Sequence, residues 1–122
     1  MKKRKDNEFP QATEEWGWKF HHIGVPTNIR KKDESCIEEL GLFVSGFAES
    51  PFGIEWMRFD EHCKIPELIQ AVPHIAFVVD DLDFELRNRG FNILVEPNSP
   101  SAGVRVAMIE ENGAPIELME FK

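Results

Sequence analysis

The chain has 122 residues, of which 42% are hydrophobic and 30% charged, enough for one compact domain and too few for two independent ones. Its 14 Lys and Arg against 22 Asp and Glu give a formal net charge of −8, which disfavours a nucleic-acid phosphate backbone as partner. No apolar run is long enough to cross a membrane, and none follows the basic N-terminus as in a secretory signal. Cys36 and Cys63 are too few for a disulfide framework, so we expect a cytoplasmic protein.

The first half of the chain is predicted to contain three strands and one helix. Aromatic and β-branched residues indicate a strand at 16–25, and apolar spacing before a glycine indicates a helix at 31–40. Further strands are expected at 42–48 and 54–60. Residues 61–72 have no clear period and are predicted to connect the halves, with one helical turn at 66–70. Residues 1–15 are expected to be a flexible N-terminal segment.

The second half is predicted to add a longer series of elements. A run of strong β formers indicates a strand at 74–79, followed by a helix that begins at Asp80-Asp81 and ends before Gly90. A strand at 91–95 and a loop at 96–103 lead to a hairpin of strands 104–109 and 114–121. The Asn112-Gly113 pair favours the positive φ angles that a tight hairpin turn requires.

An internal repeat relates the two halves. The sequence from His22 parallels that from His74, and the sequence around Glu55 parallels that around Glu117. The histidine precedes the glutamate by 33 residues in the first half and by 43 in the second. Because a strand has roughly 5–6 residues, the difference predicts that the first half lacks one strand and its turn.

Strand alternation places the repeated residues on one face of the sheet. Since successive side chains point to opposite faces, Ile75 and Phe77 suit packing under a helix and His74 faces away from it. His21 is expected opposite to His22, in a structural role, and a slip of one residue would exchange the two. Pairing of the halves around a pseudo-two-fold axis would bring two imidazoles and two carboxylates together, a ligand set that suits a divalent transition metal ion. The candidate metal ligands are His22, Glu55, His74 and Glu117.

Four segments carry motifs of a known family. They are Phe-His-His-Ile-Gly-Val at 20–25, Gly-Ile-Glu-Trp at 53–56, Pro-His-Ile-Ala-Phe-Val-Val-Asp-Asp-Leu at 73–82, and Gly-Ala-Pro-Ile-Glu-Leu-Met-Glu-Phe at 113–121. Over about residues 16–121, the chain resembles the vicinal oxygen chelate superfamily, which includes glyoxalase I, methylmalonyl-CoA epimerase, extradiol dioxygenases and the fosfomycin- and bleomycin-resistance proteins.

The resemblance implies an α+β fold of paired βαβββ modules, in which a curved, barrel-like mixed sheet surrounds a metal and the helices lie outside. Residues 16–122 would form one glyoxalase-like domain. Its modules are expected at 16–62 and 73–122, joined by a connector at 63–72, with the first module one strand short.

The glyoxalase-like branch of the superfamily implies a role for each repeated residue. Its metal ligands match His22, Glu55, His74 and Glu117. We therefore expect a glyoxalase I-like lyase or an epimerase-like isomerase with a divalent ion (Ni, Zn, Mn, Fe or Co). The ion would stabilise an enediolate on a small oxygen-bearing substrate, and Glu55 or Glu117 would be the catalytic residue that moves the proton.

The substrate pocket is expected to be apolar, with ordinary core packing as the alternative reading of the same residues. Its predicted residues are Trp18, Phe20, Met57, Phe59 and Met119. An alternative function is a metal-free binding or sequestering protein of the bleomycin-resistance type, with an apolar or cationic ligand held by three tryptophans, Trp16, Trp18 and Trp56. The family and the small size also predict a homodimer that binds a small molecule, with no nucleic-acid or membrane partner.

Overall fold

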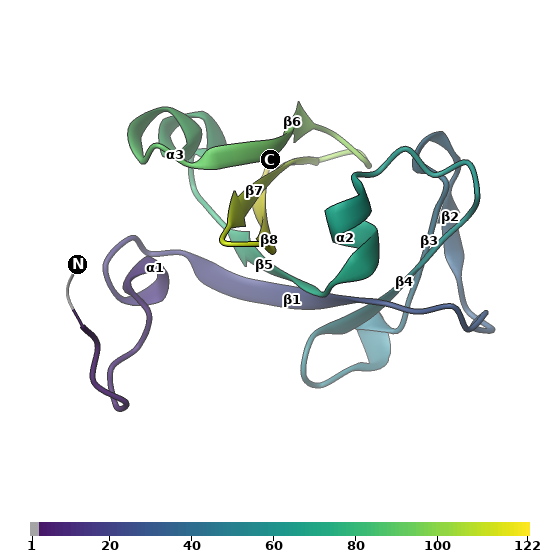
Figure 1. Cartoon of the computed structure of the whole chain (residues 1–122), viewed down its shortest axis with the longest axis horizontal. Helices are drawn as coiled ribbons and strands as arrows, with labels where there is room; N and C mark the ends of the chain where they lie inside the picture. The colour runs from purple at the N-terminus through teal and green to yellow at the C-terminus, as the bar shows by residue number, and fades with distance from the viewer. Residues whose placement is uncertain (1–2) are drawn as a thin grey trace.

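One mixed sheet of eight strands forms the body of the molecule (Figure 1). The computed structural model describes residues 3–122; residues 1–2, the start of the segment predicted to be flexible, lie outside that range. The strands are β1 (Lys19–Pro26), β2 (Ser35–Ile37), β3 (Leu42–Ser45), β4 (Ile54–Phe59), β5 (His74–Val78), β6 (Asn92–Asn98), β7 (Val104–Glu111) and β8 (Ala114–Phe121). Their order across the sheet is β2-β3-β4-β1-β5-β8-β7-β6, which places β4, β1, β5 and β8 at the centre.

The sheet divides into two modules of four strands, β1–β4 and β5–β8. In each module the first strand pairs with the last in parallel, and β1 joins β5 in an antiparallel pair between the modules. The two parallel pairs have equivalent registers, because Gly24 lies opposite Glu55 and Ala76 lies opposite Glu117. The repeat in the sequence is therefore a repeat of strand pairing, and the predicted α+β fold of paired modules is confirmed.

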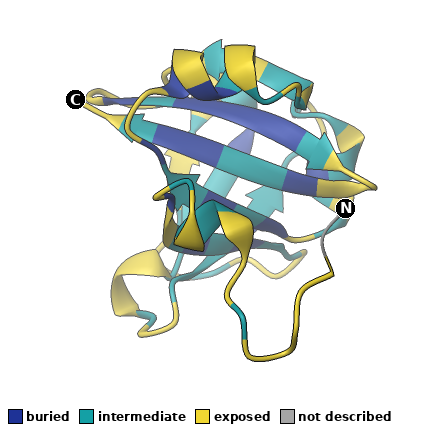
Figure 2. Cartoon of the chain, turned by 90° about the vertical axis from the view of Figure 1, so that its left-hand side faces the viewer, coloured by how far each residue is buried: buried dark blue, intermediate teal, exposed yellow. Residues whose placement is uncertain are grey.

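The second module carries the predicted helix on its outer face. Helix α3 (Leu82–Asn88) begins after Asp81, whose carboxylate accepts a hydrogen bond from the Phe84 backbone N at 3.0 Å, as expected of an N-cap. Figure 2 shows α3 lying across strands whose residues are largely buried. Leu82 of the helix and Leu118 of β8 beneath it are fully buried in the main hydrophobic cluster. Strands β7 and β8 meet at Asn112-Gly113, both with positive φ, which confirms the predicted hairpin turn.

The first module lacks the helix and not a strand, which corrects both expectations for this half. Residues predicted as a helix at 31–40 form a loop, strand β2 and a 3-10 helix, η1 (Glu38–Leu40). The reason lies in their few apolar side chains. As a strand, the segment turns Ile37 towards the inner face opposite Leu42, whereas a helix would have exposed most of its surface to water.

Side chains from the loop before β2 cover part of the outer face of the first module. The Arg58 guanidinium lies 4.1 Å from the centre of the Phe43 ring and donates two hydrogen bonds of 2.8 Å to the Glu34 carboxylate. The Lys31 ammonium lies 4.9 Å from the Trp56 ring centre. Cation–π and charge-assisted contacts thus cover the face of the first module that corresponds to the face covered by a helix in the second module.

The connector between the modules contains a short helix, α2 (Glu67–Ala71), close to the helical turn predicted at 66–70. This helix lies within the curve of the sheet (Figure 1), which corrects the expectation that all helices lie outside. Its Ile69 is only 2% exposed and faces the inner cavity, so an apolar side chain of the connector is buried between the two modules. A further short helix, α1 (Gln11–Glu14), precedes β1. None of the helices in residues 3–122 has the length and hydropathy to cross a membrane.

Candidate metal centre and its cavity

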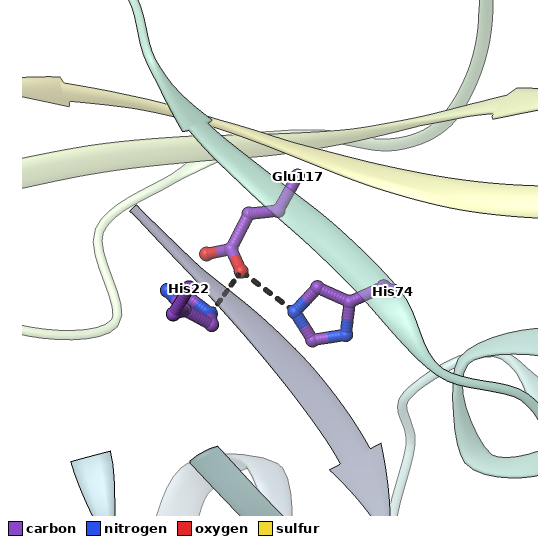
Figure 3. A group of neighbouring side chains, drawn as sticks. All are labelled: His22, His74 and Glu117. Carbon is purple, nitrogen blue, oxygen red and sulfur yellow. Dashed lines mark hydrogen bonds and ion pairs between the residues drawn. The ribbon is translucent and has the colours of Figure 1, made fainter. Parts of the chain in front are cut away.

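Three of the four predicted metal ligands form one tight cluster on the concave face of the sheet (Figure 3). His22 comes from β1, His74 from β5 and Glu117 from β8. The Glu117 Oε1 atom lies 3.0 Å from His74 Nε2 and 3.3 Å from His22 Nε2. Each of the three residues offers a ligand atom within 4.8 Å of the other two. The repeat in strand pairing therefore brings residues from both modules to one point.

Glu55 lies at the edge of this cluster. The Glu55 Oε1 atom lies 3.6 Å from His22 Nε2. His22 therefore faces two glutamates, Glu55 of its own module and Glu117 of the other. The Glu55 side chain is 24% exposed, compared with 15% for Glu117, and it lines the cavity. The two glutamates therefore differ in accessibility although the repeat makes them equivalent.

The electrostatic environments of the two carboxyl groups also differ. Burial would raise the pKa of Glu117, but the two imidazoles outweigh burial and lower that pKa to about 2. Burial is the largest effect on Glu55 and raises its pKa. For His22, burial lowers the pKa, but contact with Glu117 and the charges of both glutamates raise it overall. Glu117 is thus ionised at neutral pH, while Glu55 takes up a proton more readily.

Small residues on the central strands make room for the two imidazoles. A Cβ atom added at Gly24 would lie 2.2 Å from His74 Cε1 and 2.7 Å from Met57 Sδ, so no larger residue fits there without displacement. The equivalent residue of the second module is Ala76, fully buried opposite both His22 and Glu117. The ring of His74 therefore lies directly over the β1 backbone at Gly24.

A β-bulge brings His21 to the cluster, contrary to the expectation that it would lie on the opposite face from His22. The register between β1 and β5 shifts between Phe20 and His22. As a result the Nδ1 atoms of His21 and His22 lie 2.8 Å apart, and the His21 ring stacks on Phe47 at 4.9 Å between ring centres. Burial, followed by the charge of His22, lowers the pKa of His21. Two consecutive histidines were the only signal in the sequence for this contact.

The residues present fit a bound divalent metal ion. One nitrogen atom of this cluster, His22 Nε2, is buried without a hydrogen-bond partner among residues 3–122. His74 meets Glu117 with its Nε2, and its own unpaired Nδ1 lies on the far side of the ring, over Gly24. Ligand atoms about 2.0–2.2 Å from one ion lie about 3.0–3.4 Å from one another, as the atoms around Glu117 Oε1 do. Two imidazoles with carboxylate oxygens form a donor set that suits borderline transition ions.

The cluster lies in the wall of a cavity of about 560 Å³ enclosed by the two modules and the connector. Of the residues predicted for the substrate pocket, Met57 and Met119 line this cavity. Phe59 instead borders a separate depression beside Gln70 and Ala71. Trp18 belongs to the cluster under α3, and Phe20 is 49% exposed opposite Phe77.

The bulge also explains the positions of Trp18 and Phe20. Both were assigned to the inner face because they share alternation with His22, but the extra residue in the bulge reverses the alternation of everything before it. The other two tryptophans also lie elsewhere, since Trp16 packs against Trp18 under Arg89 and Trp56 contacts Lys31. The cavity therefore lacks the aromatic groove of three tryptophans that a cationic ligand was expected to use.

Solved structures share this fold. No protein-family model and no curated protein matches the sequence. A hypothetical protein from Bacillus halodurans C-125 aligns with a TM-score of 0.67 at 20% identity, over 86% of this chain and 95% of its own. Methylmalonyl-CoA epimerase from Mycobacterium tuberculosis aligns with a TM-score of 0.56 at 23% identity, over 85% of this chain and 88% of its own. The chain thus has the vicinal oxygen chelate fold that its sequence motifs predict.

Proposed function

We propose that this chain is a metal-dependent enzyme that moves a proton next to a carbonyl group, as a glyoxalase-like lyase or isomerase does. The observation that carries the proposal is the convergence of His22, His74 and Glu117, with Glu55 beside them, in the wall of a large cavity. The likeness of the fold to that of an epimerase supports the same reaction class. Fold alone does not determine chemistry, so the donor set is the stronger argument.

Each residue of the cluster has a role in this proposal. His22, His74 and Glu117 would hold the divalent ion, which when bound acts as a Lewis acid on a substrate oxygen. Glu55 is the candidate base, because it is the more exposed carboxylate and borders the cavity within 3.6 Å of His22. A carboxylate there can accept a proton from carbon and return it. The ionised Glu117 stays between the two imidazoles.

His21 would orient His22 for metal binding. In a pair of neutral imidazoles, only one of two facing Nδ1 atoms carries a proton. When His22 donates from Nδ1 and His21 accepts, the Nε2 of His22 keeps its lone pair for the ion. Stacking on Phe47 would hold the His21 ring in the accepting position.

Metal affinity of the full chain tests the proposal first. We expect metal-stripped protein to bind close to one divalent ion per chain by titration calorimetry and elemental mass spectrometry, and H74A/E117A to lose that binding. The matched control is H62A, which removes an exposed histidine that lies beside Glu61 and does not line the cavity. Unchanged metal affinity in H74A/E117A, with the fold intact by circular dichroism, would refute the proposed metal site.

Proton exchange tests the role of Glu55 separately. A loaded enzyme of this class exchanges a carbon-bound hydrogen of its ligand with solvent deuterium, which proton NMR follows directly. We expect E55Q to retain the metal and to slow exchange by about 10²–10⁴-fold, the usual contribution of a positioned base. Wild-type exchange rates in E55Q would assign the base elsewhere.

The apolar cavity supports a second candidate, a protein that binds or sequesters a small molecule without reaction. Apolar side chains of both modules line it, among them Leu42, Val44 and Val106. In this case metal-stripped protein would bind its ligand with unchanged affinity, and no exchange would be seen with any ion.

A further inference from the structure

The walls of the cavity differ sharply from its metal cluster in chemical character. Away from the His and Glu residues, the first module contributes Leu42, Val44 and Met57, and the second contributes Val104, Val106 and Met119. The connector adds Ile65 and Ile69. A ligand that reaches the cluster therefore has hydrocarbon on both sides for the rest of its length. A volume of about 560 Å³ lies within the range of pockets that enclose most of a drug-sized ligand.

The charges that line the cavity disfavour the binding of phosphate groups inside it. Lys64 is the only lysine or arginine among the residues that line it, and its side chain is exposed. Three carboxylates, Glu55, Glu96 and Glu117, line the same space. Recognition of several phosphate groups requires several cations or backbone donors, and the formal charge of the chain is −8. A nucleotide-bearing thioester, the kind of substrate named for the epimerase of similar fold, finds no such partners among the residues that line this cavity.

We infer that the substrate is a phosphate-free aliphatic molecule, with a carbonyl-bearing head at the His22–His74–Glu117 cluster and a hydrocarbon tail along the apolar walls. The head assignment rests on the proposed function. The tail assignment rests on the lining of the cavity alone. A 2-oxo acid of medium chain length has this form, and its single carboxylate asks for no more than one cation.

A chain-length series of ligands tests the inference. The full metal-loaded protein is titrated by calorimetry with pyruvate, 2-oxobutanoate, 2-oxohexanoate and 2-oxooctanoate, and with octanoyl-CoA. Burial of each additional methylene contributes about 0.8 kcal/mol, so we expect Kd to fall about fourfold per methylene. Octanoyl-CoA should bind more weakly than 2-oxooctanoate. A Kd independent of chain length, or tighter binding of the CoA ester, would overturn the inference.

A pair of variants on one strand localises the tail. Val44 faces the cavity from β3, whereas the next residue, Ser45, lies opposite Trp56 on the outer face. We expect V44F to weaken 2-oxooctanoate at least tenfold and to leave pyruvate unchanged, and S45F to change neither. Equal weakening of both ligands in V44F would contradict the placement of the tail. The wild-type series stays decisive if V44F does not fold.

Repeating the series on metal-stripped protein separates this inference from the proposed function. The apolar walls do not depend on an ion, so the fourfold step per methylene should persist while every Kd rises. A chain-length dependence in a protein that binds no metal would refute the proposed function and keep the tail site. Metal binding with no chain-length dependence would refute the tail site and leave the proposed function standing.

Discussion

The two modules of the sheet present the same inner face and different outer faces. Inside, each parallel strand pair places a glutamate opposite the residue two positions after a histidine. Outside, the second module is covered by α3, and the first by the loop before β2, whose Lys31 lies over Trp56 and whose Glu34 pairs with Arg58 of β4. The position of a site residue therefore depends on strand register and not on the helix behind the strand. The element that covers the outer face can therefore differ between the modules without moving His22, His74 or Glu117.

Stability should be distributed unevenly between the modules for the same reason. Leu118 and its equivalent in the first module, Trp56, occupy corresponding positions of β8 and β4. Leu118 is fully buried under α3, whereas Trp56 is half-buried, with the Lys31 ammonium over its ring. We expect L118A to lower the free energy of unfolding by about 2–5 kcal/mol. W56A should cost less than L118A despite the larger side chain, as measured by urea denaturation. An equal or larger cost for W56A would show that the first module is as tightly packed.

A second comparison exchanges the small residues of the central strands. G24A should lower the free energy of unfolding by about 1–3 kcal/mol, because its Cβ would overlap the His74 ring. It should also weaken metal binding by displacing that ring. A76G removes one buried methyl group and should cost only about 1 kcal/mol, with metal affinity retained. Calorimetric titration of both variants checks this, and normal metal affinity in G24A would contradict it.

His21 has no counterpart in the second module, where Pro73 occupies the equivalent position. We expect H21F to keep the stacking on Phe47 but to lose the acceptor for His22, and so to weaken metal binding about tenfold. H21N, which restores an acceptor, should recover part of the affinity. Nitrogen-15 NMR of the metal-free protein reports the tautomer of His22 directly. A His22 ring protonated at Nε2 and not at Nδ1 in the neutral state would argue against this role.

The smallest effect is expected on the outer face of the first module. Hydrogen bonds from Arg58 lower the pKa of Glu34 from 4.5 to about 2. Because the folded pKa is below the unfolded value, the pair stabilises the protein above about pH 4.5 and this contribution is lost as the pH falls towards 2. E34Q should flatten the dependence of the melting temperature on pH in that window. A variant with an unchanged pH profile would show that the pair contributes nothing measurable.

The repeat in the sequence predicted strands around both histidines and both glutamates, and strand alternation assigned these four side chains to one face. In the structure His22, His74 and Glu117 form the cluster and Glu55 lies at its edge. Two features escaped this prediction. The bulge before His22 adds one residue without altering composition, so alternation alone placed Trp18 and Phe20 on the wrong face. The segment at 31–40 has helix-compatible spacing, and its choice of strand depends on pairing with β3, which no local pattern records.

Among residues 3–122, the β1–β5 pair is the one strand pairing that joins the modules, and the candidate metal site lies across it, with His22 on one side and His74 and Glu117 on the other. A bound ion would then cross-link the two halves of the chain. Free ion at a hundred times its Kd would add about 2.7 kcal/mol to the free energy of unfolding. Thermal melting would thus report occupancy of the centre, and a panel of ions can be ranked from unfolding curves before any substrate is known.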